Sequence, residues 1–228
     1  IDKPLKLDCG KTINNYSLAY ETYGSLNEKK DNAILIFHAL TGDQFVSGIN
    51  PITKKEGWWS YAVGPGKAID TDKYFVICAN VIGGCMGSYG PSEINPDTNK
   101  KYGTTFPVIT INDMVNAQFN LLSFFNIDKL FAVMGGSMGG MQTLQFVNNF
   151  PDKAKVAIPI ACTASHSAQN IAFNELGRQS IMADANWENG DYSNQNKNPN
   201  KGLSVARMAA HITYLSKNGL QEKFGRKL

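Results

Sequence analysis

The stretch Leu130-Phe-Ala-Val-Met-Gly-Gly-Ser-Met-Gly-Gly-Met-Gln-Thr-Leu-Gln-Phe-Val147 decides the fold of this chain. It begins with an apolar run typical of a strand and ends with a run typical of a helix. Between the two runs lies Gly135-Gly-Ser-Met-Gly-Gly140. A G-x-S-x-G pattern between a strand and a helix indicates a nucleophile elbow, a sharp turn that exposes a serine hydroxyl. We therefore predict that Ser137 is a catalytic nucleophile. The alternative is a tight structural turn.

Apolar runs on both sides of the elbow predict further strands. They cover residues 5–8 and 16–23 (as an antiparallel pair), 33–37, 74–81, 130–136 and 156–162. Runs that are apolar throughout are typical of strands buried on both faces of a parallel sheet. Pro159 within the last run predicts a bend or a position near the sheet edge. Strands that alternate with helices predict an α/β doubly wound sheet.

A helix is expected to start at Thr110, which is placed to cap it. Asp113 complements the helix dipole there, although we expect a full capping box to need Glu or Gln. The apolar residues of this helix recur at helical spacing: Val115, Phe119, Leu122 and Phe125. From residue 165 the character changes, with helical patterns over 168–183 and 203–216, a loop over 187–202 and no further strand. We predict an α/β core over 1–164 and a helical cap over 165–228.

Composition excludes several classes of protein. The 228 residues suit one domain, or one domain with an insertion, and the net charge of +3 is scattered, which argues against nucleic acid. No apolar run approaches 18 residues and no signal peptide opens the chain, so we expect a cytoplasmic protein without a membrane span. The histidines are too scattered for a metal site. Without C-x-x-C spacing, we interpret the cysteines as buried free thiols: Cys9, Cys78, Cys85 and Cys162.

A serine nucleophile also needs two donors for the oxyanion of its tetrahedral intermediate. After an elbow, the first donor is the N–H of the next residue, here Met138. The second comes from the loop after an earlier strand, here residues 38–43, and we predict the Leu40 amide. His38 in this loop is a candidate base. Because it precedes the nucleophile and ends a different strand, we interpret it as a structural hydrogen-bonding residue that shapes the loop.

Candidates for the general base are His166 and His211, with an aspartate partner among Asp152, Asp184 and Asp191. After an elbow, the acid and the histidine normally follow the serine on loops after later strands. Both histidines lie in the predicted cap, with no strand to carry them. We therefore expect the acid and the base to lie outside this chain, in on the order of 100 further residues. The start at Ile1 and the end within a polar helical pattern, residues 223–228, fit this expectation.

Taken together, several blocks closely resemble the homoserine O-acetyltransferases, acyltransferases of methionine biosynthesis, over essentially the whole chain. The blocks are His38-Ala-Leu-Thr-Gly-Asp43, Asn80-Val-Ile-Gly-Gly-Cys85 through Gly90-Pro-Ser92, Gly135-Gly-Ser-Met-Gly-Gly-Met141, Ser167-Ala-Gln-Asn-Ile-Ala-Phe-Asn-Glu175, and Ala206-Arg-Met208 with Ala210-His-Ile-Thr-Tyr214. The resemblance implies an α/β-hydrolase fold: a mostly parallel sheet with an inserted helical cap. The C-terminal strands and helices of that fold would be absent from this chain.

The resemblance also implies a ping-pong reaction. Ser137 would take the acetyl group from acetyl-CoA, a co-substrate, and pass it to the hydroxyl of L-homoserine, without a cofactor. The Leu40 and Met138 amides would form the oxyanion hole. Arg207 would hold the homoserine carboxylate, unless it is a surface helix arginine, and Arg178 is interpreted as structural. The family's aspartate and histidine have no matching position here. The cap helices would form a homodimer.

Three alternatives stay open. Nothing in the residues separates acetyl-CoA from succinyl-CoA, or homoserine from serine, so related acyltransferases fit as well. A carboxylesterase-like hydrolase of the same fold would use the same elbow, because water and an alcohol can deacylate the same acyl-enzyme. Taken literally, the 228 residues are expected to be a non-catalytic fragment, because Ser137 lacks its base.

Overall fold

The computed structural model describes residues 1–192 and 197–226, and it divides the chain into two compact units, Ile1–Ala164 and Ser165–Leu228. Residues 193–196 of the predicted loop and residues 227–228 of the predicted end segment lie outside the described residues.

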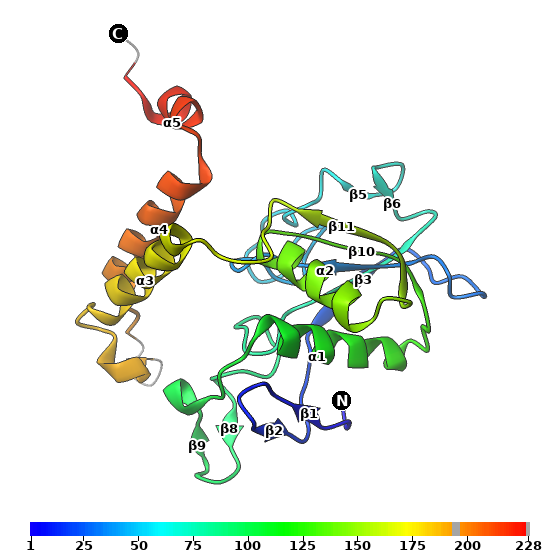
Figure 1. Cartoon of the computed structure of the whole chain (residues 1–228), viewed down its shortest axis with the longest axis horizontal. Coiled ribbons are helices and arrows are strands. Elements are labelled where there is room, and N and C mark those ends of the chain that lie inside the picture. Colours follow the sequence, from blue (N-terminus) through cyan, green and yellow to red (C-terminus); the bar gives the residue numbers. More distant parts are fainter. Residues whose placement is uncertain (193–196, 227–228) are drawn as a thin grey trace. The chain divides into compact units, whose positions relative to one another are not determined.

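The first unit contains a five-stranded sheet of order β11-β10-β4-β7-β3 (Figure 1). Four strands run parallel: β4 (Ala33–Phe37), β7 (Phe75–Ala79), β10 (Leu130–Gly136) and β11 (Ala154–Ile160). Strand β3 (Tyr20–Tyr23) pairs antiparallel with β7 at one edge. The predicted mostly parallel sheet is therefore confirmed.

Two helices pack together and belong to this unit, α1 (Ile111–Phe124) and α2 (Met138–Asn149) (Figure 1). Helix α1 starts where predicted. The Thr110 hydroxyl accepts the Asp113 N–H at 3.2 Å, and Asp113 Oδ2 accepts the Thr110 N–H at 2.9 Å. The expectation that a full capping box needs Glu or Gln is wrong here, since the shorter aspartate side chain closes the same two bonds.

Apolar side chains cover both faces of the sheet, which explains why β4 and β7 are apolar throughout. Successive residues of a strand point to opposite faces. On one face, Leu35 and Ile77 belong to a cluster that includes residues of α1 and α2. On the other face, Ile36 and Cys78 belong to a cluster with Val46, Val63 and Ile69, from the connection between β4 and β7. Burial on both faces fixes the central strands and their carboxyl ends.

Short elements make up the rest of the first unit. They are β1 (Leu5–Lys6), β2 (Thr12–Ile13), β5 (Val63–Gly64), β6 (Ile69–Asp70), β8 (Ile94–Asn95), β9 (Lys100–Lys101) and the 3₁₀ helix η1 (Gly103–Thr105). The predicted pairing of residues 5–8 with 16–23 is wrong, because β1 pairs with β2. Gly10, with φ of 84°, sits in the connecting turn, while residues 20–23 instead extend the sheet beside β7.

Strand β11 forms the other edge of the sheet, and in the described part of the chain it pairs with β10 alone. Its apolar side chains stay in contact with solvent: Val156 is 43% exposed, and Ile158 and Ile160 are each 39% exposed. Pro159 lies in this strand, which is an edge strand within the described residues.

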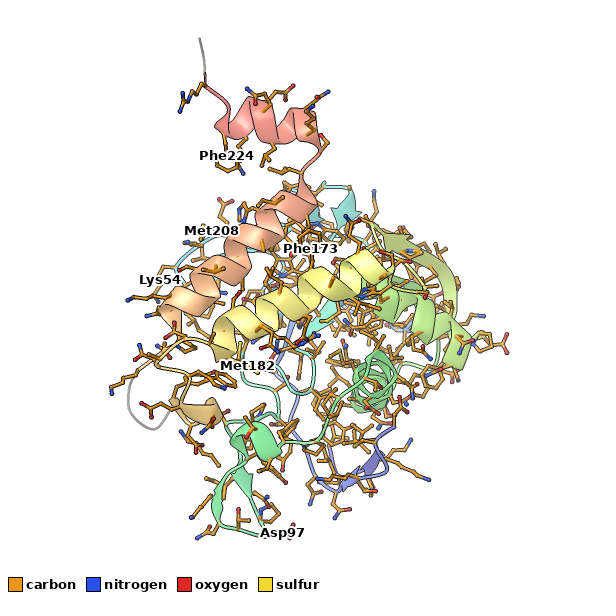
Figure 2. All side chains as sticks on the ribbon, turned by 60° about the vertical axis from the view of Figure 1, so that its left-hand side comes forward. Lys54, Asp97, Phe173, Met182, Met208 and Phe224 are labelled. Carbon is orange, nitrogen blue, oxygen red and sulfur yellow. The ribbon has the colours of Figure 1, made fainter. Side chains whose placement is uncertain are left out.

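The second unit contains the helices α3 (Ala168–Met182), α4 (Asn200–Tyr214) and α5 (Lys217–Phe224), with the 3₁₀ helix η2 (Glu188–Gly190). Helices α3 and α4 pack along each other, and Figure 2 labels Met182 on α3 and Met208 on α4. They lie close together at Gly202, where an added Cβ would lie 2.8 Å from the Ile181 Cα. No strand follows β11 in residues 1–192 and 197–226, as predicted.

The four cysteines are free, as predicted, but not all are buried. Cys78 is buried and Cys162 is partly buried, whereas Cys9 and Cys85 are exposed, so the prediction of burial is wrong for those two. Among the described residues, no cluster of three or more potential ligand side chains could hold a metal ion. No helix in that part of the chain is both long and apolar enough to cross a membrane.

Candidate active site

Ser137 occupies a strained turn between β10 and α2. Its backbone has φ of 56° and ψ of −120°, which non-glycine residues rarely adopt. Two backbone hydrogen bonds hold the turn: the Ser137 N–H donates to the Ile160 carbonyl at 3.0 Å, and the Ser137 carbonyl accepts the Met141 N–H at 3.0 Å. Ser137 itself is exposed. The turn thus presents a hydroxyl to solvent, as a nucleophile elbow does.

The two glycines that flank the serine in the G-x-S-x-G pattern are required by space. A Cβ on Gly135 would lie 2.5 Å from the Gly139 carbonyl and 2.6 Å from the Phe37 oxygen. A Cβ on Gly139 would overlap the same Phe37 oxygen. At Gly136, by contrast, an added Cβ meets nothing within 4 Å. The start of α2 therefore lies directly against the end of β4.

This packing brings the two predicted oxyanion donors to the same end of the sheet, just beyond the carboxyl ends of β4 and β10. Phe37 stands opposite Gly135 in the parallel pair of β4 and β10, so both chains leave the sheet at the same end. In the described part of the chain, neither the Leu40 N–H nor the Met138 N–H donates a hydrogen bond. The Leu40 side chain is 68% exposed. Both amides thus lack an acceptor within the described residues, and their role as oxyanion donors stays a prediction.

His38 is buried, and both of its ring nitrogens are occupied. Nδ1 lies 2.7 Å from the Ala39 carbonyl oxygen, and Nε2 accepts the Val81 N–H at 3.1 Å. The Asn80 side-chain amide also reaches Nε2, at 3.2 Å. Burial lowers the pKa of His38 below its usual value. These contacts agree with a structural interpretation of His38, and they leave no ring nitrogen to accept the proton of Ser137.

A network of buried polar side chains surrounds His38, and the sequence patterns did not predict it. The Gln142 amide approaches the His38 carbonyl at 3.4 Å, and Gln142 Oε1 accepts the Gln118 amide at 2.8 Å. On the other side, Asn80 Oδ1 accepts the Met86 N–H at 3.1 Å. This network of side chains connects α1, α2 and the ends of β4 and β7, so it joins the loop after β4 to the helix that follows the elbow.

One signal in the sequence could have indicated these residues. Gln118 falls on the apolar stripe of α1, three residues after Val115 and four before Leu122. Asn80 directly follows a strand that is apolar throughout. A polar side chain in an apolar pattern needs a buried hydrogen-bond partner, although the pattern does not say which one.

The structure gives the candidate acids and bases no catalytic arrangement. His166 is exposed, and His211 Nδ1 lies 3.0 Å from the Arg207 carbonyl of its own helix. The Asp184 carboxylate accepts two backbone N–H groups, from Asn186 at 2.9 Å and from Gly202 at 2.8 Å, and these bonds lower its pKa. The remaining candidates, Asp152 and Asp191, are exposed. In residues 1–192 and 197–226, none of these aspartates is hydrogen-bonded to a histidine.

Arg207 lies on α4 and is exposed, and among the described residues it forms no ion pair. It borders a mainly apolar groove of about 400 Å³ between α4 and α5, with Met208, His211, Ile212, Leu220 and Phe224. Figure 2 labels Met208 and Phe224 on these two helices. Arg178, in contrast, forms a salt bridge with Glu175 one turn away. A free guanidinium is suited to binding a carboxylate.

Three comparisons place this geometry among known proteins. A profile described as the alpha/beta hydrolase fold matches residues 32–227. The chain is 98% identical, over 228 residues, to a homoserine O-acetyltransferase from Pelagibacter ubique, covering 100% of this chain and 61% of that protein. It is similar in structure to the homoserine O-acetyltransferase from Bacillus anthracis, with a TM-score of 0.89 and 30% identity, over 99% of this chain and 62% of that one.

It is also similar to the crystal structure of esterase E22, with a TM-score of 0.86 and 35% identity, over 98% of this chain and 63% of that one. The chain thus spans about three fifths of the length of the curated relatives that it matches. The structural match extends through both units, and it includes proteins named as transferases and as esterases.

Proposed function

We propose an acyl-transfer function for this chain, which belongs to the alpha/beta hydrolase fold family. In a complete protein of its relatives' length, an acetyl group would pass from acetyl-CoA to the hydroxyl of L-homoserine, a step of methionine biosynthesis. The observation that carries this proposal is the strained, exposed elbow at Ser137. The 98% identity to a protein named homoserine O-acetyltransferase supports the choice of substrates.

In the first half-reaction, a base removes the proton of the Ser137 hydroxyl as Oγ attacks the carbonyl carbon of the acetyl thioester. The carbonyl electrons move onto oxygen, and their return breaks the C–S bond, so that CoA leaves as the protonated thiol. The N–H groups of Leu40 and Met138 receive the oxyanion. One such donor contributes roughly 10²–10³ in kcat. The positive end of the α2 dipole favours the same negative charge.

In the second half-reaction, the homoserine hydroxyl gives up its proton and attacks the acetyl-Ser137 ester. The serine leaves as the free hydroxyl, and O-acetyl-homoserine forms. Arg207 binds the carboxylate of the amino acid, since a guanidinium makes two parallel hydrogen bonds to it. The chemistry needs no cofactor. The acid and the base come from the part of the protein outside this chain, and we propose that residues 1–228 alone do not turn over.

The second unit is proposed to act as a cap over the substrate site. Its helix α4 leaves Leu203, Val205, Met208, Ile212 and Tyr214 at least 45% exposed. We propose that a second copy of the protein covers these side chains, which gives a homodimer. Sedimentation of the complete protein tests this assembly. The free cysteines of the described chain are in keeping with a reducing cytoplasm.

A hydrolase is the second candidate, because the similar structure of esterase E22 has the same fold. An esterase and an acyltransferase share the acyl-enzyme and differ in what deacylates it. Water would deacylate the acyl-enzyme in place of homoserine if the site did not exclude water.

The decisive experiment measures CoA release by the complete protein with a thiol reagent, with and without L-homoserine, and identifies the product by mass. We expect homoserine to accelerate CoA release, and we expect O-acetyl-homoserine as the product. Release that is independent of homoserine, with acetate as the product, would establish the hydrolase instead. Ser137→Ala should abolish both reactions. Arg207→Leu should raise the KM for homoserine, whereas the matched control Arg178→Leu should not.

A further inference from the structure

We propose that His38 and Asn80 are positioning residues that aim the Leu40 N–H at the oxyanion of the reaction. This inference rests on the proposed function, because it assigns a task within the acylation of Ser137. Neither side chain touches the substrate in this account. They act through the peptide bond that joins Ala39 to Leu40.

The hydrogen atoms of His38 are assigned by its partners. The Ala39 carbonyl can only accept a hydrogen bond, so Nδ1 carries a hydrogen and donates to it at 2.7 Å. The Val81 N–H can only donate, so Nε2 is unprotonated and accepts it at 3.1 Å. The imidazole is therefore neutral, in one tautomer, and it links the end of β7 to the loop after β4.

Holding the Ala39 carbonyl fixes the direction of the Leu40 N–H. In a planar trans peptide the C=O and the following N–H point in opposite directions. The Ala39 oxygen points toward the buried imidazole, so the Leu40 N–H points away from it. The same oxygen also accepts the Gly42 N–H at 2.8 Å. Two donors on one carbonyl leave this peptide little freedom to rotate.

Asn80 holds the imidazole, and it is itself held. Its amide nitrogen donates to His38 Nε2 at 3.2 Å, while its Oδ1 accepts the Met86 N–H at 3.1 Å. Its backbone carbonyl accepts the Ser88 hydroxyl at 2.6 Å. All of these groups are neutral and are provided by the fold before any substrate binds. Donors fixed in this way need no reorganisation when charge develops, which is the requirement for oxyanion stabilisation.

Two variants of His38 separate positioning from mere packing. Asparagine places an amide nitrogen at the position of Nδ1, so His38→Asn can still donate to the Ala39 carbonyl, but it leaves Val81 and Asn80 without their acceptor. Glutamine reaches the position of Nε2, so His38→Gln can still accept from those groups, but it removes the donor at Nδ1 and leaves the Ala39 carbonyl with the Gly42 N–H alone. His38→Gln should be the more stable variant, because it keeps the buried acceptor for Val81 and Asn80. If His38 only packs, His38→Gln should also be the more active variant. Positioning predicts the opposite order.

The experiment uses the complete protein and follows acetylation of Ser137 by intact mass after mixing with acetyl-CoA. His38→Gln is expected to lower the acylation rate constant by roughly 10²-fold at similar KM, the effect of one lost oxyanion donor. His38→Asn is expected to stay within about tenfold of the unmodified protein, although urea unfolding should find it the less stable variant.

Equal acylation by the two variants, or faster acylation by His38→Gln, would overturn the inference alone, provided that the unmodified protein is acetylated at Ser137. If it is not, the proposed function fails as well. Should neither His38 variant fold, Asn80→Ala decides the question. A fall in the acylation rate constant at unchanged KM is expected for it, and an unchanged rate constant would overturn the proposal.

Discussion

The strained backbone at Ser137 predicts that glycine at this position gives a more stable protein than alanine does. Ser137→Gly and Ser137→Ala both delete the nucleophilic hydroxyl, so both are expected to abolish acyl transfer. They differ at one atom, because only glycine lacks the Cβ that makes φ of 56° with ψ of −120° unfavourable. The two backbone hydrogen bonds of this residue are kept in both variants. The pair therefore isolates the strain.

The magnitude follows from two opposing effects. A non-glycine residue in a sparsely populated region of this kind destabilises the fold by about 1–3 kcal/mol. Glycine gains more freedom than alanine in the unfolded chain, which offsets about 0.5–1 kcal/mol. We expect Ser137→Gly to be about 1 kcal/mol more stable than Ser137→Ala. For a protein of this size, that difference corresponds to a rise in Tm of about 2–4 °C.

Urea unfolding, followed by circular dichroism, measures the difference between the two variants. Their m-values should agree, since neither change alters the area exposed on unfolding. A Ser137→Gly variant that is no more stable than Ser137→Ala would refute the reasoning. The positive φ at residue 137 would then not destabilise the folded state, and the elbow would store no strain.

Gly139→Ala should destabilise the protein by about 3 kcal/mol, because the new Cβ would overlap a backbone carbonyl of β4. The control Gly136→Ala has open space around the new Cβ and should leave the stability nearly unchanged. Thermal unfolding measures both variants. His38, whose folded-state pKa is lowered by burial despite nearby Asp43, should make stability depend on pH. In the unfolded chain the pKa of His38 is about 6.5, so below that pH the unfolded state binds one proton that the folded state does not. The free energy of unfolding is therefore fully present above pH 6.5 and decreases as the pH falls further, by at most about 1.4 kcal/mol per pH unit. Urea unfolding at pH 7.5 and 5.5 should find this slope reduced in His38→Gln; an equal slope in that variant would assign the effect to other groups.

Local patterns predicted the central elements well. Strand β4 begins and ends at the predicted residues, 33 and 37, because burial on both faces leaves an uninterrupted apolar run. The elbow was also readable, since a sharp turn between a strand and a helix imposes glycines at fixed spacing. Features that depend on neighbours in sequence were therefore accessible without a structure.

Pairings between distant residues were not accessible. Residues 20–23 alternate like one arm of a hairpin, but their partner is β7, more than fifty residues away. The contact of His38 with Asn80 spans 42 residues, and that of Gln142 with the His38 carbonyl spans 104. A hydrogen-bonding side chain reveals that it needs a partner, while the identity of the partner depends on which strands lie side by side.

The proline of β11 has a consequence for solubility. The segment Val156-Ala-Ile-Pro-Ile-Ala161 is apolar, uncharged and, in the described chain, open along one edge. Such segments stack into cross-β aggregates when every backbone N–H can pair with another chain. Proline has no N–H, so Pro159 breaks that row of donors. The same residue that is tolerated at the sheet edge thus acts as a gatekeeper against fibril formation whenever this edge is uncovered.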